Sequence, residues 1–289
     1  MRHADVDLIA FAGSDHVGLR IMREAAAHPG RSSVKKVVAA MGGKNAVVVD
    51  SDADLDLAVA ETLASAFDYQ GQTCSAASRI IVLADAYEAF VQRFVEAARE
   101  LTIGCPEDPA TRLGPMITAE ARNTILRFIE RGKQEGHTAL AIPEPPGGRP
   151  GGGFFVGPHI FADVAPDAVI AQQAISGPVV AVMKVRDIDD ALRIANGTRH
   201  GLTGGLFSRS PATIARCRRE FRVGNLFINR AITGALVGRQ PFGGLRTSGT
   251  GAQAGGPDSL QQFMEPRTTT ENTLRRGFAP PDDLLTEER

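Results

Sequence analysis

The pattern most informative about the fold lies in residues 45–83, NAVVVDSDADLDLAVAETLASAFDYQGQTCSAASRIIVL. Near-continuous apolar runs at residues 45–50 and 79–83 are typical of strands that are covered on both faces of a sheet. Between these runs, Leu55, Val59 and Leu63 recur at intervals of four residues, which predicts a helix with one buried face. A strand, a helix and a second strand in this order predict an α/β fold.

The same alternation continues along the chain. Further strands are predicted at residues 179–185, 204–207 and 225–229. We therefore expect a sheet with helices on both of its faces. The residues expected to begin the helices are those that favour caps: Asp50, Ser51 and Asp52 for the first helix, then Thr118, Asp187, and Ser210 followed by Pro211.

The composition is ordinary for a soluble globular protein, with 43% hydrophobic and 22% charged residues among 289. This length predicts one large domain or two unequal ones. A net charge of −1 gives no reason to expect binding to nucleic acid or to a membrane surface. Three widely spaced cysteines argue against a metal site and a disulfide framework, and no signal peptide or membrane span is recognisable. We therefore expect a cytoplasmic protein, where free thiols persist.

The stretch Gly71-Gln72-Thr73-Cys74-Ser75-Ala76 is the sharpest chemical signal. It follows the predicted helix and precedes the predicted strand at residues 79–83, so it forms a connection between them. A cysteine in such a connection can be exposed and held by backbone, as a thiolate nucleophile requires. The alternative is an inert buried cysteine, and these six residues do not separate the two.

Three glycine-containing segments suggest binding to a ligand. Phe11-Ala12-Gly13-Ser14 precedes an expected helix and forms either a phosphate-binding corner or an ordinary capped helix. Met41-Gly42-Gly43-Lys44 allows close approach of a ligand to the backbone, or is only a turn. The glycine-rich stretch at residues 224–249 suits a substrate-binding loop that follows a strand.

Together and in this order, these segments resemble the aldehyde dehydrogenase superfamily. The shared features are the FxGS turn, the GGK turn, the GQxC nucleophile, the Gly-Pro before a strand and the PFGG loop, over residues 8–267. Within that superfamily the resemblance is greatest to the L-glutamate γ-semialdehyde dehydrogenases (1-pyrroline-5-carboxylate dehydrogenases) of proline catabolism. It rests on residues 67–79, FDYQGQTCSAASR, and on residues 223–260, VGNLFINRAITGALVGRQPFGGLRTSGTGAQAGGPDSL.

The resemblance implies a division of the chain. Residues 1–43 would be a remnant of a Rossmann-type NAD-binding domain, and residues 44–246 the α/β catalytic domain. Residues 247–272 would hold the end of the anchor loop and an oligomerisation strand over residues 261–272, followed by a disordered tail at residues 273–289. A homodimer, or association with a proline-catabolic protein, is the partnership that this implies.

The resemblance also implies a reaction and its substrate-side residues. The Cys74 thiolate would attack the aldehyde carbon, and a thioester would form and be hydrolysed to the acid. The backbone N–H of Cys74 would stabilise the oxyanion. Gly234 and Ala235 would donate backbone N–H groups to the substrate carboxylate, with Ser75 nearby, and Phe242 would pack on the aliphatic part of the substrate.

NAD is the cofactor that the resemblance implies. Gly13 and Ser14 would border its phosphates, and Gly42 would border its nicotinamide. No metal is expected. Ten residues precede Phe11, whereas the family has a long region there that contains most of the dinucleotide-binding sheet, so we expect one strand and one helix of that sheet.

The sequence departs from the family at positions that matter for catalysis. Ala40 stands where the family has the glutamate that acts as general base for deacylation, and loss of such a base costs about 100- to 10,000-fold in rate. Ala174 and Ser176 replace the glutamate that binds a cofactor ribose and the aromatic ring near the nicotinamide. Thr73 replaces a lysine that is frequent beside the nucleophile in this subfamily.

Three hypotheses remain open at this point. The chain is an NAD-dependent dehydrogenase for L-glutamate γ-semialdehyde, with weak or no turnover as this chain alone. Alternatively, it is a non-catalytic domain, a pseudoenzyme that retains the fold and binds a partner. Between these, a Cys74 thiolate without a base would cleave activated esters in a burst that then stalls.

Overall fold

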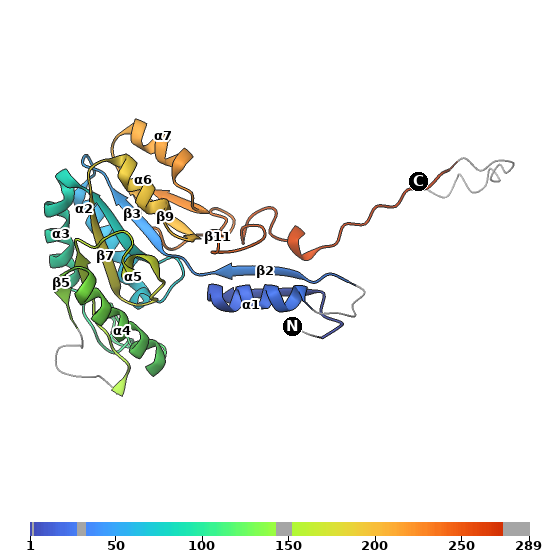
Figure 1. Cartoon of the computed structure of the whole chain (residues 1–289), viewed down its shortest axis with the longest axis horizontal. Coiled ribbons are helices and arrows are strands. Elements are labelled where there is room, and N and C mark those ends of the chain that lie inside the picture. Colours follow the sequence, from blue (N-terminus) through green and yellow to red (C-terminus); the bar gives the residue numbers. More distant parts are fainter. Residues whose placement is uncertain (2, 28–32, 143–151, 274–289) are drawn as a thin grey trace.

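The computed structural model describes residues 1, 3–27, 33–142 and 152–273. Most of the chain forms one α/β body, and a smaller unit made by the N-terminal residues lies beside it (Figure 1). The C-terminal segment leads away from both. The α/β class predicted from the sequence is confirmed.

The body is built on a seven-stranded sheet with the order β10-β9-β3-β4-β7-β6-β5. All neighbouring strands are parallel except the edge pair β5 and β6, which is antiparallel. The predicted strands are confirmed, whereas β5 and β6 were not predicted. The strands are β3 (Asn45–Val49), β4 (Ala77–Leu83), β5 (His137–Ala141), β6 (His159–Ala162), β7 (Val179–Val185), β9 (Thr203–Phe207) and β10 (Asn225–Ile228).

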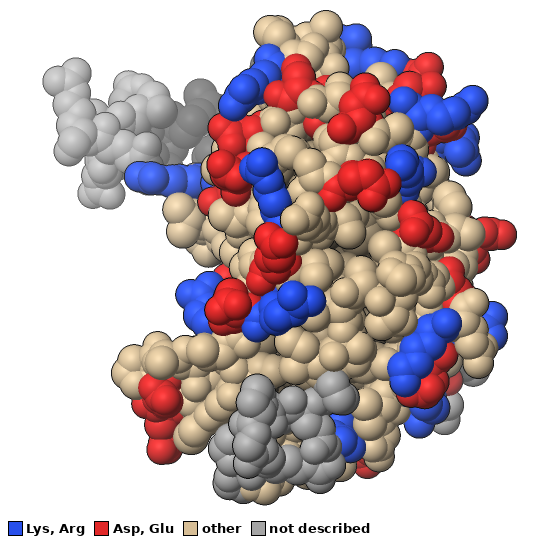
Figure 2. Space-filling model, turned by 90° about the vertical axis from the view of Figure 1, so that its left-hand side faces the viewer, with Lys and Arg blue, Asp and Glu red and all other residues tan. Residues whose placement is uncertain are grey.

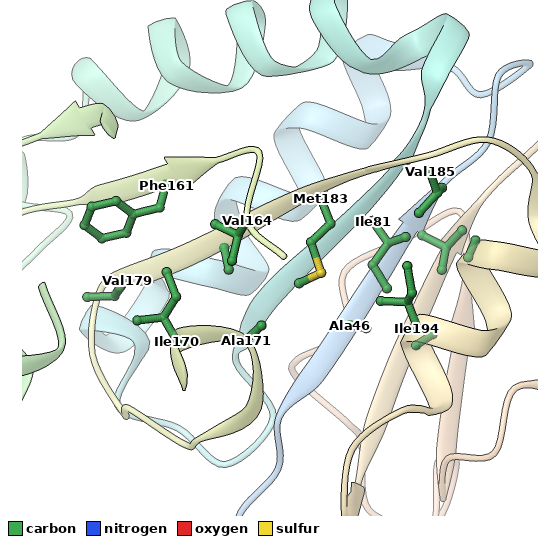
Figure 3. Packing of buried hydrophobic residues seen from close by; sticks show 14 of the residues in the cluster. Ala46, Ile81, Phe161, Val164, Ile170, Ala171, Val179, Met183, Val185 and Ile194 are labelled. Atoms are coloured by element: carbon green, nitrogen blue, oxygen red, sulfur yellow. The ribbon is translucent and has the colours of Figure 1, made fainter. Parts of the chain in front are cut away.

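Helices cover both faces of this sheet, as predicted. Alternate residues of one strand supply both cores: Ile81 of β4 belongs to the core in Figure 3, while Ile80 and Val82 belong to the core on the other face. The helices α2 (Leu55–Phe67) and α3 (Ala84–Arg99) cover the second face. The core of Figure 3 is covered by α4 (Ala119–Glu135), α5 (Val169–Gln172), α6 (Ile188–Asn196) and α7 (Pro211–Glu220).

The helix caps agree with the sequence except at α2. The side chains of Thr118, Asp187 and Ser210 cap α4, α6 and α7 as predicted. The expected cap of α2 at residues 50–52 is wrong, because the side chain of Asp54 accepts the N–H of Leu57 instead. The two acidic residues of the predicted cap are used elsewhere: their carboxylates accept the hydroxyl group at the end of β9.

The N-terminal unit is larger than expected. It contains β1 (Leu8–Gly13), α1 (Asp15–Ala26) and a second strand, β2 (Lys36–Met41), which pairs with β1 in parallel. The expectation of one strand and one helix is therefore corrected to a complete βαβ unit. Residues 248–250 attach this unit to the body, since the N–H groups of Met41 and Thr250 donate across to Ser248 and Ala39 at 2.9 and 2.8 Å.

Outside the seven-stranded sheet, β8 (His200–Gly201) and β11 (Leu245–Arg246) form a small antiparallel sheet. The strand predicted over residues 261–272 is not formed: a short 3-10 helix, Gln261–Phe263, is followed by residues without regular structure up to 273. A strand needs a partner for its backbone hydrogen bonds, and among the described residues no strand pairs with this segment; β2 contacts it through the side chain of Lys36, which reaches Met264 and Glu265. The tail predicted as disordered lies outside the described residues beyond residue 273.

Acidic and basic side chains are interspersed on the face of the body shown in Figure 2. Within the described ranges, none of the helices combines the length and the apolar character that a membrane crossing would require.

Candidate active site

Cys74 lies in the loop between α2 and β4, and the backbone of this loop follows a strained path. Tyr69, Gln70 and Gly71 are in the left-handed region in succession, with φ of 55°, 59° and 66°. At Gly71 an added Cβ would lie 2.5 Å from the carbonyl oxygen of Gly177. A glycine is therefore required for the loop to lie against the turn that precedes β7.

The side chain of Asn45 fixes the backbone around the thiol. Its amide donates to the carbonyl oxygens of Cys74 and Ala76, at 2.8 and 2.9 Å, and accepts the N–H of Thr203 at 3.1 Å. Asn45 is 3% exposed. Because three hydrogen bonds engage one buried amide, the first residue of β3 joins the Cys74 loop to the start of β9.

The environments of the cysteines differ. Cys74 is exposed, whereas Cys217 is buried in α7. Burial raises the pKa of the Cys217 thiol to about 11, so that thiol stays protonated near neutral pH. Cys74 is therefore not the inert buried cysteine that the sequence left as an alternative.

A cavity of about 530 Å³ opens at Cys74 and extends to the N-terminal βαβ unit. Gly13, Ser14, Gly42 and Phe242, all predicted to belong to the site, line it together with Cys74. No heavy atom lies within 4 Å of the position that a Cβ of Gly42 would take, so its backbone faces open space. The structure thus brings together predicted residues from four separate segments.

Three predicted residues lie elsewhere. Ser75 is 7% exposed, and neither Ser75, Gly234 nor Ala235 is among the described residues that line the cavity. Gly234 has a φ of 73° and open space around its Cβ position, as expected for an exposed loop. Their role in substrate binding stays a prediction.

The positions at which the sequence departs from the family all face this cavity. Ala40, Ala174 and Ser176 line it, and so does Thr73. None of these side chains has a carboxylate, an amine or an aromatic ring. The cavity therefore has apolar or hydroxyl groups at the places where the resemblance implies a base and two cofactor contacts.

Two further cavity residues were missed from the sequence. Asp15 and His200 line the cavity, and the Nε2 of His200 lies 3.8 Å from the Oδ2 of Asp15. Among the described lining residues, these two and Cys74 are the titratable side chains. Asp15 was visible only as an acidic residue in the first turn of an expected helix, and His200 belonged to no motif recognised in the sequence.

Two cations are buried near the start of β3. Arg79 donates to the carbonyl oxygens of Lys44, Ile194 and Ala195 at 2.8–2.9 Å, which anchors the C-terminal turn of α6. Burial, with a contribution from the neighbouring Arg246, lowers the pKa of Arg79 to about 9. Burial, with Arg79 beside it, lowers the pKa of Lys44 to about 7.

Comparisons of the sequence with a family model and with curated relatives point to the same family. The model of the aldehyde dehydrogenase family matches residues 1–269. The 1-pyrroline-5-carboxylate dehydrogenase of Geobacillus kaustophilus (strain HTA426) is 49% identical over 270 residues, which are 93% of this chain and 52% of that protein. The Bacillus subtilis (strain 168) protein of the same name is 48% identical over 272 residues, covering 94% and 52%. The chain therefore spans about half the length of the curated relatives it matches.

Solved structures agree with the sequence comparison. A 1-pyrroline-5-carboxylate dehydrogenase from Thermus, solved with bound NAD, has a TM-score of 0.87 and 44% identity, covering 91% of this chain and 50% of that one. Proline utilization A from Bdellovibrio bacteriovorus, inactivated by N-propargylglycine, has a TM-score of 0.91 and 52% identity, covering 97% and 29%. Because the family model matches nearly the whole chain, this protein belongs to the aldehyde dehydrogenase family.

Proposed function

We propose that this chain takes part in the NAD-dependent oxidation of L-glutamate γ-semialdehyde to L-glutamate in proline catabolism, with Cys74 as the covalent nucleophile. The observation that carries the proposal is the exposed Cys74 thiol on a cavity shared with Gly13, Ser14, Gly42 and Phe242. The names of the relatives that match nearly all of the chain support the choice of substrate.

Cys74 supplies the part of this reaction that the chain itself contains. Its thiolate adds to the aldehyde carbon, and loss of hydride from that adduct leaves a thioester on the sulfur. The loop is held by Asn45, so the backbone N–H of Cys74 stays in place for the developing oxyanion. Hydrolysis of the thioester then releases the acid and regenerates the thiol.

The residues present fit one end of NAD better than the other. The N-terminus of α1, with Gly13 and Ser14, borders the cavity and presents N–H groups suited to phosphate oxygens. Ala174 and Ser176 offer neither a carboxylate for a ribose hydroxyl nor a ring for the nicotinamide. When bound, NAD would accept the hydride. We expect it to bind weakly to this chain.

The catalytic proposal predicts weak turnover for this chain alone, whereas a non-catalytic domain would give none. Ala40 cannot accept a proton from water, and the loss of a general base commonly costs about 100- to 10,000-fold. The measurement is the absorbance of reduced cofactor with NAD and glutamate semialdehyde, using the Cys74→Ala variant as background. If wild-type protein gives no rate above that variant, the catalytic proposal is refuted.

A non-catalytic role is the second candidate, and the cavity positions Ala40, Ala174 and Ser176 favour it. Such a domain would retain the fold and bind a partner, either a second copy or a proline-catabolic protein. The direct test is the melting temperature measured with and without millimolar NAD. A rise of several degrees in Tm would contradict this candidate, because a ligand that binds only the folded state must stabilise it.

A further inference from the structure

The Cys74 cavity contains a titratable pair, Asp15 and His200, that takes no part in the thiol chemistry described above. Asp15 comes from the first turn of α1 and His200 from β8, so the pair lies where the N-terminal unit meets the body. The side chain of His200 is 4% exposed and that of Asp15 is 15% exposed. Both line the same cavity as the thiol.

The tautomer of His200 follows from its hydrogen bonds. Thr247 Oγ1 donates its single proton to the carbonyl oxygen of Arg199 at 2.8 Å. The same oxygen lies 3.3 Å from the Nδ1 of His200 and, with its own proton on Arg199, it is placed to accept the Nδ1–H. In the neutral ring the lone pair is therefore on Nε2, the nitrogen that faces Asp15 at 3.8 Å.

This geometry suits a general base. At 3.8 Å, the Asp15 carboxylate is too far from Nε2 for a direct hydrogen bond, but it is close enough to favour the positive charge that appears when Nε2 gains a proton. Burial lowers the pKa of His200 below its ordinary 6.5; the charges of Arg199 and Lys44 act in the same direction, while Asp15 and a hydrogen bond with the backbone of Gly42 act against them. The ring is therefore neutral near pH 7, which is the form able to accept a proton.

We infer that His200, oriented by Thr247 and backed by Asp15, is the general base of the Cys74 cavity and activates the water that hydrolyses an acyl group on Cys74. Ala40 stands where the resemblance implies a glutamate base. His200 lines the same cavity, and its imidazole is a side chain that can accept a proton there. The inference rests on the proposed function in one respect, namely that Cys74 becomes acylated.

The chemistry needs no oxidant when an activated ester replaces the aldehyde. Cys74 thiolate adds to the ester carbonyl, the bond to the leaving alcohol breaks, and a thioester forms. Water gives a proton to Nε2 of His200 and its oxygen adds to the thioester carbon. The carbon–sulfur bond breaks, the acid leaves, and the proton on His200 returns to the thiolate or to solvent. The balance is ester and water to acid and alcohol.

The test measures acylation and deacylation separately, with 4-nitrophenyl acetate as the probe. The burst of 4-nitrophenol and the mass of acetyl-Cys74 report acylation, and the decay of that mass reports deacylation. We expect His200→Gln to keep the burst and to slow the decay by about 100-fold or more. Thr247→Val should slow it by a smaller factor, and Thr247→Ser should restore it, because serine keeps the acceptor oxygen.

The pH profile distinguishes a base from a structural role. Decay in the wild type should fall as the pH drops through the pKa of His200, below its ordinary 6.5, and this limb should be absent in His200→Gln. His137→Gln, an exposed histidine of the edge strand β5, is the matched control and should behave as the wild type. Circular dichroism melts of each variant confirm folding.

The outcomes separate the two proposals. Absence of acetyl-Cys74 in the wild type would overturn both the nucleophile and the base. A normal burst with equal decay in wild type and in folded His200→Gln would overturn the base alone. A slow decay that keeps its pH limb in His200→Gln would assign that limb to another group and would also overturn it.

Discussion

The ammonium group of Lys44 is expected to destabilise the folded protein in a pH-dependent way. Lys44 is 2% exposed, and its Nζ has no hydrogen-bond partner among the described residues. Burial and the nearby Arg79 lower its pKa from 10.5 to about 7. The difference, at 1.36 kcal/mol for each pKa unit, sets an upper limit of about 5 kcal/mol on the cost of burying the charge.

The sign of the effect follows from the protons bound in each state. Between about pH 7 and 10.5, the unfolded chain retains the proton on Lys44 and the folded chain does not, so stability rises with pH in that window. Below about pH 7 both states are charged and the cost is present in full. Lys44→Met removes this destabilisation, and imperfect packing of the shorter side chain offsets about 1 kcal/mol of the gain in unfolding free energy. We therefore expect the variant to be more stable by about 1–4 kcal/mol at pH 6.

The assay is urea unfolding of wild type and Lys44→Met at pH 6, 7, 8, 9 and 10. The stability difference should be constant below about pH 7 and should shrink steadily above it, because the wild type becomes more stable as it loses the proton. Lys133→Met, at a lysine 48% exposed and paired with Glu130 on α4, is the control and should show no such trend. A stability difference between wild type and Lys44→Met that does not change with pH would show that Lys44 is not buried in the charged form.

Two further predictions concern the loop that contains Cys74. Gly71→Ala places a Cβ 2.5 Å from the carbonyl oxygen of Gly177, at a residue whose φ is 66°. We therefore expect the free energy of unfolding to fall by about 1–3 kcal/mol and iodoacetamide to alkylate Cys74 more slowly. Unchanged stability would show that the turn at Gly177 moves freely. Asn45→Ala leaves two carbonyl oxygens and one N–H without their partner, so a loss of about 2–4 kcal/mol in urea unfolding is expected, and a loss under 1 kcal/mol would mean that water replaces the amide.

Much of the fold is readable from the chain because buried parallel strands and amphipathic helices have different periods. The strands β3 and β7 are apolar except for one residue each, Asn45 and Lys184, and were located from these near-continuous apolar runs. Strand β2 was missed: KVVAAM lies in a two-stranded sheet and has an uneven burial pattern. The cap of α2 was misplaced because several acidic residues precede it, and only the contacts of Ser208 show which of them are already engaged.

The candidate site, like the fold, combines residues that are recognisable in local motifs with contacts that only the folded chain creates. Cys74, the proposed nucleophile, stands in a local motif, as do Ala40 and Ala174, so these positions and the family resemblance are readable from the chain alone. The pairing of Asp15 with His200 joins residues 185 positions apart, and the tautomer of His200 depends on Thr247, which β11 brings close to it. No local pattern encodes such a contact, because distant segments meet only when the sheet and its connecting loops fold together. The family and the candidate nucleophile are therefore encoded locally, whereas the groups that surround Cys74 are set by the folding of distant segments against one another.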